Sequence, residues 1–476
     1  MYMPIFGNLN SLPIRLWDEA RLAINAYEML HDGQFIVTHF DGSPDMWNTK
    51  PPLMIWSQVF FMKMIGVNEL AIRLPSAIAA FLTCCALIFF TLKYLKSFWL
   101  GFITVFVLIT TQGYIQVHAS RTGDYDCLVT LFTTLQAIFF FLYCENKKNK
   151  YLYFFFVATT CAVLTKSITG FMFLPAMAIY CAIVKMLVPT LKNKHFYIGL
   201  SLFITVALGY YFVRELQNPG YLLAVYDNEL GGRFLDVKEN HQQDFWFYLN
   251  RQIELEFSYW HLLLPCGVLI GFVLKNKLIN RLTLLLLLLT TSFILIISSA
   301  KTKIEWYDVP LYPFYAILVA IMIHFVFEAL KMNPWIIQQM KFNAIPLVFL
   351  FLIGVYPYQE IFKKTYKPTE IGEELAFYEM GNYLQKASRG KHNLDNQHAL
   401  YEGYQAHLDF YLKVLVDQGH DVKHTPHQNL KEGDIAFTQD YQIQEYIAQH
   451  FDYEIIRQQG RVITYKILSI QEKNSF

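Results

Sequence analysis

The sequence carries little charge, and the charge it has is balanced. Asp, Glu, Lys and Arg make up 16% of the 476 residues, and the formal net charge is +1. A chain with so little net charge has no general electrostatic attraction for nucleic acid or for another strongly acidic macromolecule. We therefore expect no nucleic-acid partner.

Cysteine is also scarce. The chain has seven cysteines, and all of them lie in or at the ends of apolar segments, away from the polar loops and the C-terminal region. No two of them have CxxC spacing. This distribution excludes a disulfide framework and a cysteine-rich metal site.

Apolar residues, in contrast, are abundant. They make up 54% of the chain, and continuous apolar runs of about 17 to 22 residues recur over the first three quarters, each long enough to cross ~30 Å of hydrocarbon as a helix. The runs do not alternate with polar residues, as lipid-facing strands would. The fold class that we predict is an all-α polytopic membrane protein.

The placement of lysine and arginine predicts the topology. Ten spans are expected, at residues 70–92, 98–117, 126–144, 151–166, 168–188, 196–213, 259–274, 282–299, 307–327 and 342–358. Basic clusters occupy every second connection, including those with Lys147 and Lys341, and the positive-inside rule makes these connections cytoplasmic. The other loops, 10–51, 118–125, 214–258 and 300–306, then face outward, as does everything after residue 359.

The chain is expected to have two domains. Residues 1–360 form the transmembrane domain, with a first outer loop at 10–51 and a large outer loop at 214–258. Residues 361–476 have the composition of a small soluble extracytoplasmic α/β domain, with helices near 373–386 and 404–418 and strands near 434–438 and 462–467. Residues 1–9 look like the last turns of a helix, so we expect a first span to precede them, and residues 53–65 are expected to form an interfacial helix.

The first outer loop holds two adjacent acids, Asp18 and Glu19, at the start of an expected helix that runs to about residue 30. Asp18 would cap that helix and Glu19 would favour its dipole. A carboxylate at this position would also serve as a general base toward an acceptor hydroxyl. The sequence leaves both interpretations open.

Six cations lie on the outer side, where positive charge is normally scarce near helix ends. They are Lys50, Arg121, Lys166, Arg251, Lys301 and Lys303. A single lysine there would be a solvated or snorkelling side chain. Six together favour an anion, and a phosphate held at the bilayer surface is the simplest candidate.

Further polar residues lie in the other outer loops. Asp124 and Asp126 follow Arg121 directly before a span, so they would cap the helix, bind Mg²⁺ or Mn²⁺, or position an acceptor nucleophile. His241 precedes an aromatic run that would hold it near the headgroup plane, although a surface role is the alternative. Tyr307 and Tyr312 flank Pro310 and are expected to line a cavity.

In this order the motifs are familiar. The series WDEAR, NTKPPL, RTGDYD, HxxxFWFY and KTKxxWYxxPxYP, over roughly residues 16–357, resembles the bacterial branch of the protein O-mannosyltransferase superfamily. The greatest similarity is to the lipid A aminoarabinose transferases. The resemblance implies a GT-C fold, a lipid-linked sugar donor such as one on undecaprenyl phosphate, a site on the outer face, and inversion at the anomeric carbon.

The resemblance also implies roles for particular residues. Asp18 and Glu19 match the acidic pair of the first outer loop, Lys50 the lysine that binds the donor phosphate, and Asp126 the second essential acid. His241 matches the loop histidine. Thr49 stands where the aminoarabinose transferases carry a metal-ligating glutamate, so a zinc ion at His241 would lack that ligand.

The sequence therefore predicts a membrane glycosyltransferase that moves a hexose or pentose from a polyprenyl-phosphate carrier to a lipid, glycan or protein. The predicted catalytic residues are Asp18, Glu19 and Asp126. The predicted substrate-binding residues are Lys50, Arg121, Asp124, His241, Arg251, Lys301, Lys303 and Tyr307. A divalent metal (Mg²⁺, Mn²⁺ or Zn²⁺) is expected at Asp126 and His241.

The expected location is a bacterial inner membrane, with the site and the C-terminal domain in the periplasm. A multi-span transporter of an anionic or lipid-linked substrate is the alternative. The charges lie in outer loops instead of mid-span, and no internal repeat is visible, both of which disfavour a transporter. A structural or sensory protein would leave the outer cations unexplained.

Overall fold

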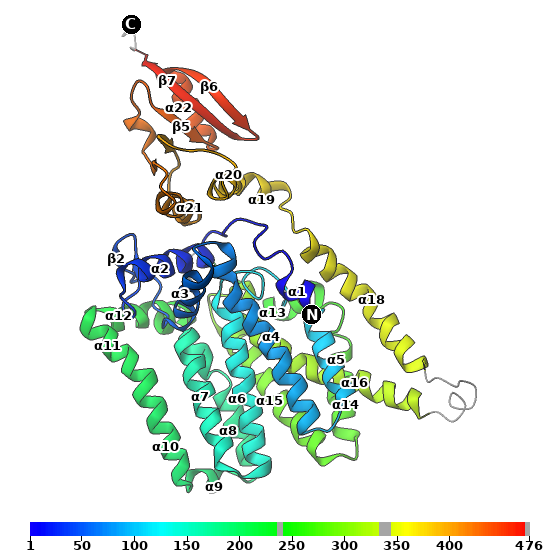
Figure 1. Ribbon diagram of the computed structural model, residues 1–476. Coiled ribbons are helices and arrows are strands. Elements are labelled where there is room, and N and C mark those ends of the chain that lie inside the picture. Colours follow the sequence, from blue (N-terminus) through cyan, green and yellow to red (C-terminus); the bar gives the residue numbers. More distant parts are fainter. Residues whose placement is uncertain (236–240, 333–343, 472–476) are drawn as a thin grey trace.

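The structure is a computed structural model that describes residues 1–235, 241–332 and 344–471. Figure 1 shows a bundle of long helices with a smaller domain of helices and a sheet above one end of it. The predicted fold class, a polytopic helical protein with a small C-terminal α/β domain, is confirmed.

Seven helical segments in the described part of the chain are long and apolar enough to cross a membrane. They are α4 (Glu69–Lys93), α6 (Tyr125–Asn146), α7 (Asn149–Lys166) with η1 (Ser167–Phe171), α10 (Lys194–Phe203) with η2 (Ile204–Leu208) and α11 (Gly209–Gln217), α15 (Lys277–Ser299), η5 (Glu305–Leu311) with α16 (Tyr312–Lys331), and α18 (Ile345–Tyr366). The three other predicted spans coincide with shorter apolar helices, α5 (Phe98–Ile109), α8 (Leu174–Ile183) and α14 (Leu263–Val273). Length and composition thus support seven of the ten predicted crossings. Lys341 and the first two residues of the span predicted at 342–358 lie outside the described residues.

Short polar side chains start several of these helices. Asn68, Ser97, Asp124 and Asn276 each occupy an N-cap position, and each side chain accepts a hydrogen bond from a backbone N–H of the first turn. Such caps satisfy donors that the helix leaves without partners. They explain why α4, α5, α6 and α15 begin where they do.

The span predicted at 98–117 is wrong in its second half, because α5 ends at Ile109. The Thr110 hydroxyl donates to the Phe106 carbonyl at 2.7 Å, and the Gly113 N–H donates to the Glu256 carbonyl at 2.9 Å. A Cβ on Gly113 would lie 2.3 Å from the Tyr312 hydroxyl, so only glycine fits there. The segment 110–124 therefore forms a loop that packs close to α16.

The smaller elements around the bundle are α1 (Tyr2–Phe6), α2 (Asp18–Asp32), β1 (His39–Phe40), β2 (Ser43–Pro44), α3 (Leu53–Ile65), α9 (Leu187–Leu191), α12 (Tyr221–Val225), η3 (Tyr226–Leu235), α13 (Phe247–Arg251) and η4 (Gln252–Glu256). The predicted helices at the start of the first outer loop and at 53–65 are confirmed as helices. In Figure 1, α2, α3, α12 and the C-terminal domain lie at the upper end of the bundle, whereas α9 lies at the lower end. The expected outer loops 10–51 and 214–258 and the C-terminal domain thus share one end.

The C-terminal domain is built on a five-stranded mixed sheet. Its helices are α19 (Gly372–Phe377), α20 (Glu379–Ser388), α21 (Ala406–Asp417), η6 (His427–Asn429) and α22 (Tyr441–His450), and its strands are β3 (Gln397–Ala399), β4 (Val422–His424), β5 (Ile435–Thr438), β6 (Phe451–Gln459) and β7 (Val462–Ile470). The strand order is β4-β3-β5-β7-β6, with β3 parallel to β4 and β5 and the other pairs antiparallel. The expected helices and the strands β5 and β7 are present. β3, β4 and β6 were not predicted.

This domain is docked on the first outer loop. The Tyr411 hydroxyl of α21 accepts from the Ile14 N–H at 3.0 Å and donates to Glu69 at 2.7 Å, and Lys413 lies 3.2 Å from Glu28 of α2. Apolar residues of α20 and α21 belong to the same buried cluster as those of α2 and α4. The C-terminal domain therefore helps to fix the loop that carries Asp18.

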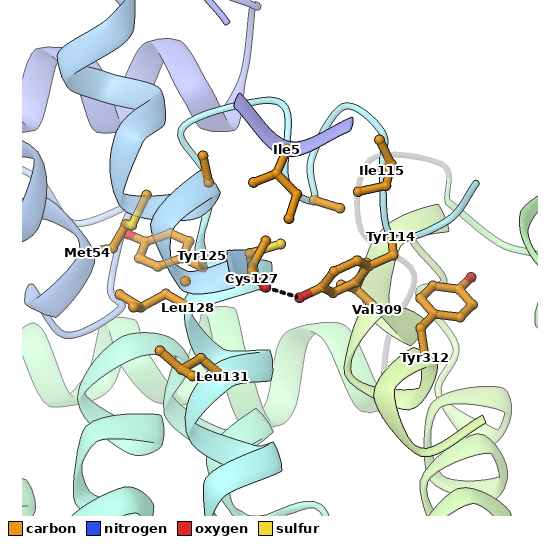
Figure 2. Packing of buried hydrophobic residues seen from close by; sticks show 14 of the residues in the cluster. Ile5, Met54, Tyr114, Ile115, Tyr125, Cys127, Leu128, Leu131, Val309 and Tyr312 are labelled. Atoms are coloured by element: carbon orange, nitrogen blue, oxygen red, sulfur yellow. Dashed lines mark hydrogen bonds between the residues drawn. The ribbon is translucent and has the colours of Figure 1, made fainter. Parts of the chain in front are cut away.

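A layer of apolar side chains lies under the loops at the upper end of the bundle. Figure 2 shows Tyr114 and Ile115 of the 110–124 loop beside Val309 and Tyr312, with Cys127 of α6 close by. All five side chains are buried. Close packing of this kind resists displacement of the loop.

Candidate active site

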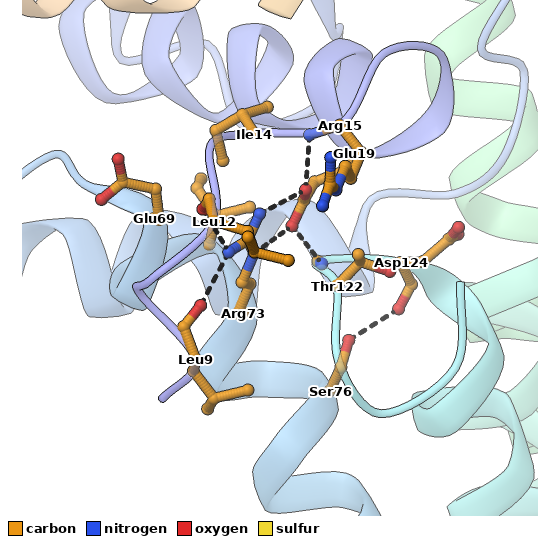
Figure 3. Close-up of polar contacts among 12 residues, drawn as sticks. Leu9, Leu12, Ile14, Arg15, Glu19, Glu69, Arg73, Ser76, Thr122 and Asp124 are labelled. Carbon is orange, nitrogen blue, oxygen red and sulfur yellow. Dashed lines mark hydrogen bonds and ion pairs between the residues drawn. The ribbon is translucent and has the colours of Figure 1, made fainter. Parts of the chain in front are cut away.

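The site is built around a buried ion pair between Glu19 and Arg73. The Arg73 guanidinium donates to the two Glu19 carboxylate oxygens at 2.7 and 2.9 Å, as Figure 3 shows. The same carboxylate accepts the backbone N–H groups of Arg15 and Gly123, both at 2.8 Å. Burial raises the pKa of Glu19, but the charge and hydrogen bonds of Arg73 outweigh it, and the pKa is lowered overall. Glu19 thus joins the first outer loop, α4 and the 110–124 loop.

Asp18 precedes Glu19 in the chain but has a different environment. The α2 helix begins at Asp18, and Trp17 is its N-cap residue. Asp18 is only half-buried, and it lies with His118 and Asp124 in a group whose ligand atoms are all within 4.8 Å of one another. Of the two adjacent acids in the first loop, Asp18 is the one that joins this group.

His118 was not singled out by the sequence, yet it lies at the centre of this group. Its Nδ1 is 2.8 Å from the Asp124 carboxylate, and its ring stacks on Trp306 with a centroid distance of 3.5 Å. Burial lowers the pKa of His118, but the hydrogen bond and charge of Asp124, followed by the charges of Asp18 and Asp126, raise it overall. The other Asp124 oxygen caps α6 by accepting the Tyr125 N–H at 2.7 Å. Both oxygens of Asp124 are therefore in use.

Asp126 contacts a lysine in the structure. Lys166, at the end of α7, donates to both Asp126 oxygens at 2.6 and 2.7 Å, and both side chains are buried. The Lys166 ammonium also lies 4.8 Å from the centre of the Tyr307 ring. Asp126 thus fixes a buried cation at the membrane end of the site.

A cavity of about 520 Å³ opens at this cation. Its polar lining residues include Lys50, Asp126, Lys166, Glu229, Thr302 and Tyr307, and its apolar residues include Ile168, Phe171, Met172, Ile296 and Ile297. The Lys50 ammonium is 3.5 Å from the Glu229 carboxylate and 5.4 Å from the centre of the Tyr125 ring. We call this the first cavity. One part of the lining carries two lysines, each paired with a carboxylate, and most of the rest is apolar, so the cavity offers ammonium groups beside an apolar surface.

The remaining predicted cations do not gather here. Arg121 donates to backbone carbonyls of the N-terminal segment, and Arg251 pairs with Glu256 and Glu305, both at 3.0 Å. Lys303 donates to the Gln243 and Ala300 carbonyls, and Lys301 is exposed. The expected cluster of six phosphate-binding cations is therefore reduced to Lys50 and Lys166 in the first cavity.

His241 is exposed, and its carbonyl accepts the Lys303 N–H at 3.0 Å. Among the residues that the structure describes, the group of three possible metal ligands is Asp18, His118 and Asp124. Asp126 and His241 are not members of that group. The ligand set expected from the sequence thus differs from the one that the fold assembles.

The sequence did contain a signal for His118. The residues Thr110, Thr111, Gln112 and Gly113 interrupt the apolar run of the span predicted at 98–117. Four polar or flexible residues in succession favour a loop over a membrane helix. That signal would have placed His118 in a longer outer loop with Asp124.

The chain is similar to several known proteins. Residues 49–211 match the family described as dolichyl-phosphate-mannose-protein mannosyltransferase. An uncharacterized protein of Aquifex aeolicus is 27% identical over 321 residues, and the undecaprenyl phosphate-alpha-4-amino-4-deoxy-L-arabinose arabinosyl transferase of Aeromonas salmonicida is 25% identical over 372 residues. These alignments cover 66% and 74% of this chain but only 60% and 64% of the relatives' own lengths.

The fold matches a solved structure over almost its whole length. ArnT from Cupriavidus metallidurans, in its crystal structure bound to undecaprenyl phosphate, superposes with a TM-score of 0.66 and 14% sequence identity. The match covers 97% of this chain and 95% of ArnT. The chain thus has the fold of ArnT, and in residues 49–211 its sequence is similar to the dolichyl-phosphate-mannose-protein mannosyltransferase family.

Proposed function

We propose that the protein transfers a sugar from a polyprenyl-phosphate carrier to an acceptor at the end of the bundle that carries α2 and the C-terminal domain. The observation that carries this proposal is the first cavity, whose cations Lys50 and Lys166 share one lining with a long apolar wall. A phosphate would contact the two ammonium groups, and the polyprenyl chain would lie on the apolar residues. A relative of this chain is named as using an undecaprenyl-phosphate donor, which supports the same class of donor here.

In the proposed reaction, the bond between the anomeric carbon and the carrier phosphate breaks while a bond to the acceptor oxygen forms. The phosphate leaves as an anion, and Lys50 and Lys166 stabilise its charge. Asp126 keeps Lys166 in place through two hydrogen bonds. Attack from the side opposite the phosphate gives inversion at the anomeric carbon.

Asp18 is the best candidate for the general base. The buried Glu19 carboxylate accepts hydrogen bonds from Arg73 and from two backbone N–H groups, and the buried Asp124 carboxylate contacts His118 and the start of α6. Asp18 is half-buried at the edge of the same group. It would take the proton of an acceptor hydroxyl, whereas an anionic acceptor would need no base and Asp18 would orient it.

We also propose that the group of Asp18, His118 and Asp124 would hold a divalent cation, in which case Asp18 would serve as a ligand instead of a base. Two carboxylates and one imidazole suit Mn²⁺ or Zn²⁺ better than Mg²⁺, which prefers oxygen ligands and retained waters. A bound cation would help to stabilise the negative charge of the leaving phosphate. Binding of Mn²⁺ can be measured by electron paramagnetic resonance. We expect His118→Ala to weaken the affinity for Mn²⁺ about tenfold or more. Unchanged Mn²⁺ affinity in His118→Ala would exclude this ligand set.

We further propose that this end of the bundle faces the periplasm of a bacterial inner membrane. The basic connection near α9 lies at the opposite end of the bundle, which the positive-inside rule assigns to the cytoplasm. Labelling of single cysteines introduced at exposed Asp32 and Lys192 with a membrane-impermeant reagent in intact cells tests this orientation. Labelling at Lys192 without labelling at Asp32 would reverse it.

The experiment that tests the function is transfer of radiolabelled sugar from a polyprenyl-phosphate donor in membranes that contain the protein. We expect Asp18→Asn to lower the rate about 10²-fold or more, the usual scale for loss of general-base assistance. Asp32→Asn, an exposed acid at the other end of the same helix, is the matched control. The fraction that acquires label, lipid or protein, identifies the acceptor. A normal rate in folded Asp18→Asn protein would remove Asp18 from the mechanism.

A further inference from the structure

A second cavity, of about 430 Å³, lies beside the site and shares no lining residue with the first cavity. It is bordered by the N-terminal segment, the 110–124 loop, the end of α13 and η4, and the end of α18. Five cations are among its lining residues: Arg15, Arg73, Arg121, Arg251 and Lys364. Among the described residues, two acids, Glu256 and Glu374, line it as well.

Three of the five cations are neutralised by carboxylates. Arg15 contacts Glu370, Arg73 pairs with Glu19, and Arg251 pairs with Glu256. These pairs account for the charges of Arg15, Arg73 and Arg251 and for the acid Glu256, and the other lining acid, Glu374, lies 3.4 Å from Arg15. Arg121 and Lys364 remain.

Arg121 is held by neutral groups alone. Its guanidinium donates to the carbonyls of Pro4, Ile5 and Gly7, and within the described ranges no carboxylate forms an ion pair with it. Burial, followed by the nearby charge of Arg73, lowers the pKa of Arg121 to about 10. A cation that is partly desolvated and has no counterion favours the binding of an anion.

Lys364 reaches the same cavity from α18. Its ammonium donates to the Gln112 side-chain carbonyl at 2.6 Å, and the Gln112 amide in turn donates to the Tyr259 hydroxyl at 2.9 Å. The neighbouring Lys363 differs, because it pairs with Glu360 at 2.7 Å. Gln112 therefore orients Lys364 toward the cavity without neutralising it.

We propose that the second cavity is an anion site that holds a phosphate group through Arg121 and Lys364. Two cations that converge from different elements can bind phosphate oxygens with charge-assisted hydrogen bonds. Helix α18, whose end borders the cavity, is apolar over most of its length, and its residues Leu352 and Tyr356 are exposed. A lipid headgroup could therefore reach the site as readily as free phosphate.

The site has a defined relation to the reaction centre. Gln116, Val117 and Thr122 line the second cavity, and His118 and Asp124 of the same loop belong to the group that contains Asp18. A phosphate bound to Arg121 would thus lie against the loop that carries two members of that group. Binding at this site does not require that the protein transfer sugar.

The test is native mass spectrometry of the purified full-length protein, without sugar donor, titrated with phosphatidylglycerol. We expect Lys364→Ala and Arg121→Gln each to weaken retention of the lipid about tenfold, the scale of one charge-assisted contact. Lys363→Ala is the matched control, because it removes an adjacent lysine that does not line the cavity. Lys50→Ala should also leave retention unchanged, since Lys50 lines the first cavity.

Inorganic phosphate distinguishes the two sources of the anion. Competition by millimolar phosphate that depends on Lys364 assigns the site to a free anion, whereas retention of lipid without such competition assigns it to a headgroup. Arg121 also binds the N-terminal segment, so Arg121→Gln alone could fail by misfolding, but Lys364 makes a single contact outside the core. Wild-type retention in Lys364→Ala, or equal losses in Lys363→Ala and Lys364→Ala, would overturn the proposal.

Discussion

Replacing Glu19 with glutamine removes one charge from a buried ion pair while keeping the size of the side chain. The two carboxylate oxygens accept four hydrogen bonds, two from Arg73 and one each from the N–H groups of Arg15 and Gly123. Glutamine has one oxygen, so its amide NH₂ would face two of these donors. Arg73 would become a buried charge without a counterion. Breaking such a pair typically destabilises a protein by about 3–5 kcal/mol.

The expected shift in Tm follows from the size of the chain. The unfolding entropy of about 2.1 cal/mol/K per residue makes 1 kcal/mol equivalent to roughly 1 °C for 476 residues. We therefore expect Glu19→Gln to lower Tm by about 3–5 °C in scanning fluorimetry of the detergent-purified protein. Asp32→Asn, at the exposed end of the same helix, should leave Tm unchanged. The double variant Glu19→Gln/Arg73→Met should recover part of the loss, because it removes the unpaired guanidinium.

The same experiment separates positioning from catalysis. If Glu19 acts by positioning the loops, its loss of activity should accompany the loss of stability, and Arg73→Met alone should lower both. A Glu19→Gln protein with wild-type Tm and strongly reduced turnover would refute this reasoning. Glu19 would then contact the substrate, as the family resemblance implies.

Three further changes test other parts of the structure. Lys50→Ala should weaken binding of undecaprenyl phosphate about tenfold in a ligand-induced Tm shift, because it removes one charge-assisted contact in the first cavity; Lys63→Ala on the exposed side of α3 is the control, and equal affinity in both would contradict the donor site. Asp126→Asn should destabilise the protein by about 3–5 kcal/mol because Lys166 loses its counterion, and an unchanged Tm would show that the pair is dispensable. Burial, followed by a nearby arginine charge, lowers the pKa of His407 to about 3, so its contribution to stability is present above pH 6.5 and is lost as pH falls toward 3. Between pH 7 and pH 5 the free energy of unfolding should fall by about 2 kcal/mol, measured as Tm against pH, and His407→Phe should remove this slope; a full slope in His407→Phe would assign it to other groups.

Much of the architecture was predictable because membrane insertion imposes strong local rules. A helix that crosses ~30 Å of hydrocarbon must satisfy its backbone internally and must be apolar over its length, so its position can be read from a single segment. The predicted spans at 70–92, 126–144 and 282–299 accordingly lie within α4, α6 and α15. The predicted end of a span was wrong where the segment contains polar residues. This happened at Thr110, in the span predicted to continue to residue 117.

The short strands β3 and β4 were missed for a related reason. Each has only three residues, which is too few for a pattern of alternating side chains to be recognised. Their stability comes from parallel pairing with distant segments, Gln397 with Val422 and with Ile435. Such pairing is a property of the fold and not of any single segment.

The candidate site shows the same division between what a local segment determines and what the tertiary fold determines. The sequence by itself identified Asp18, Lys50 and Asp126 as residues of unusual chemistry at helix ends on one side of the membrane, because local composition and the charge rule act on neighbouring residues. It did not determine which of these charges meet. Only the tertiary structure paired Asp126 with Lys166, placed His118 beside Asp124, and sent Arg121 to a second cavity. Ion pairs and cavities depend on distances between segments that are far apart in the chain, and those distances are set by how the helices pack.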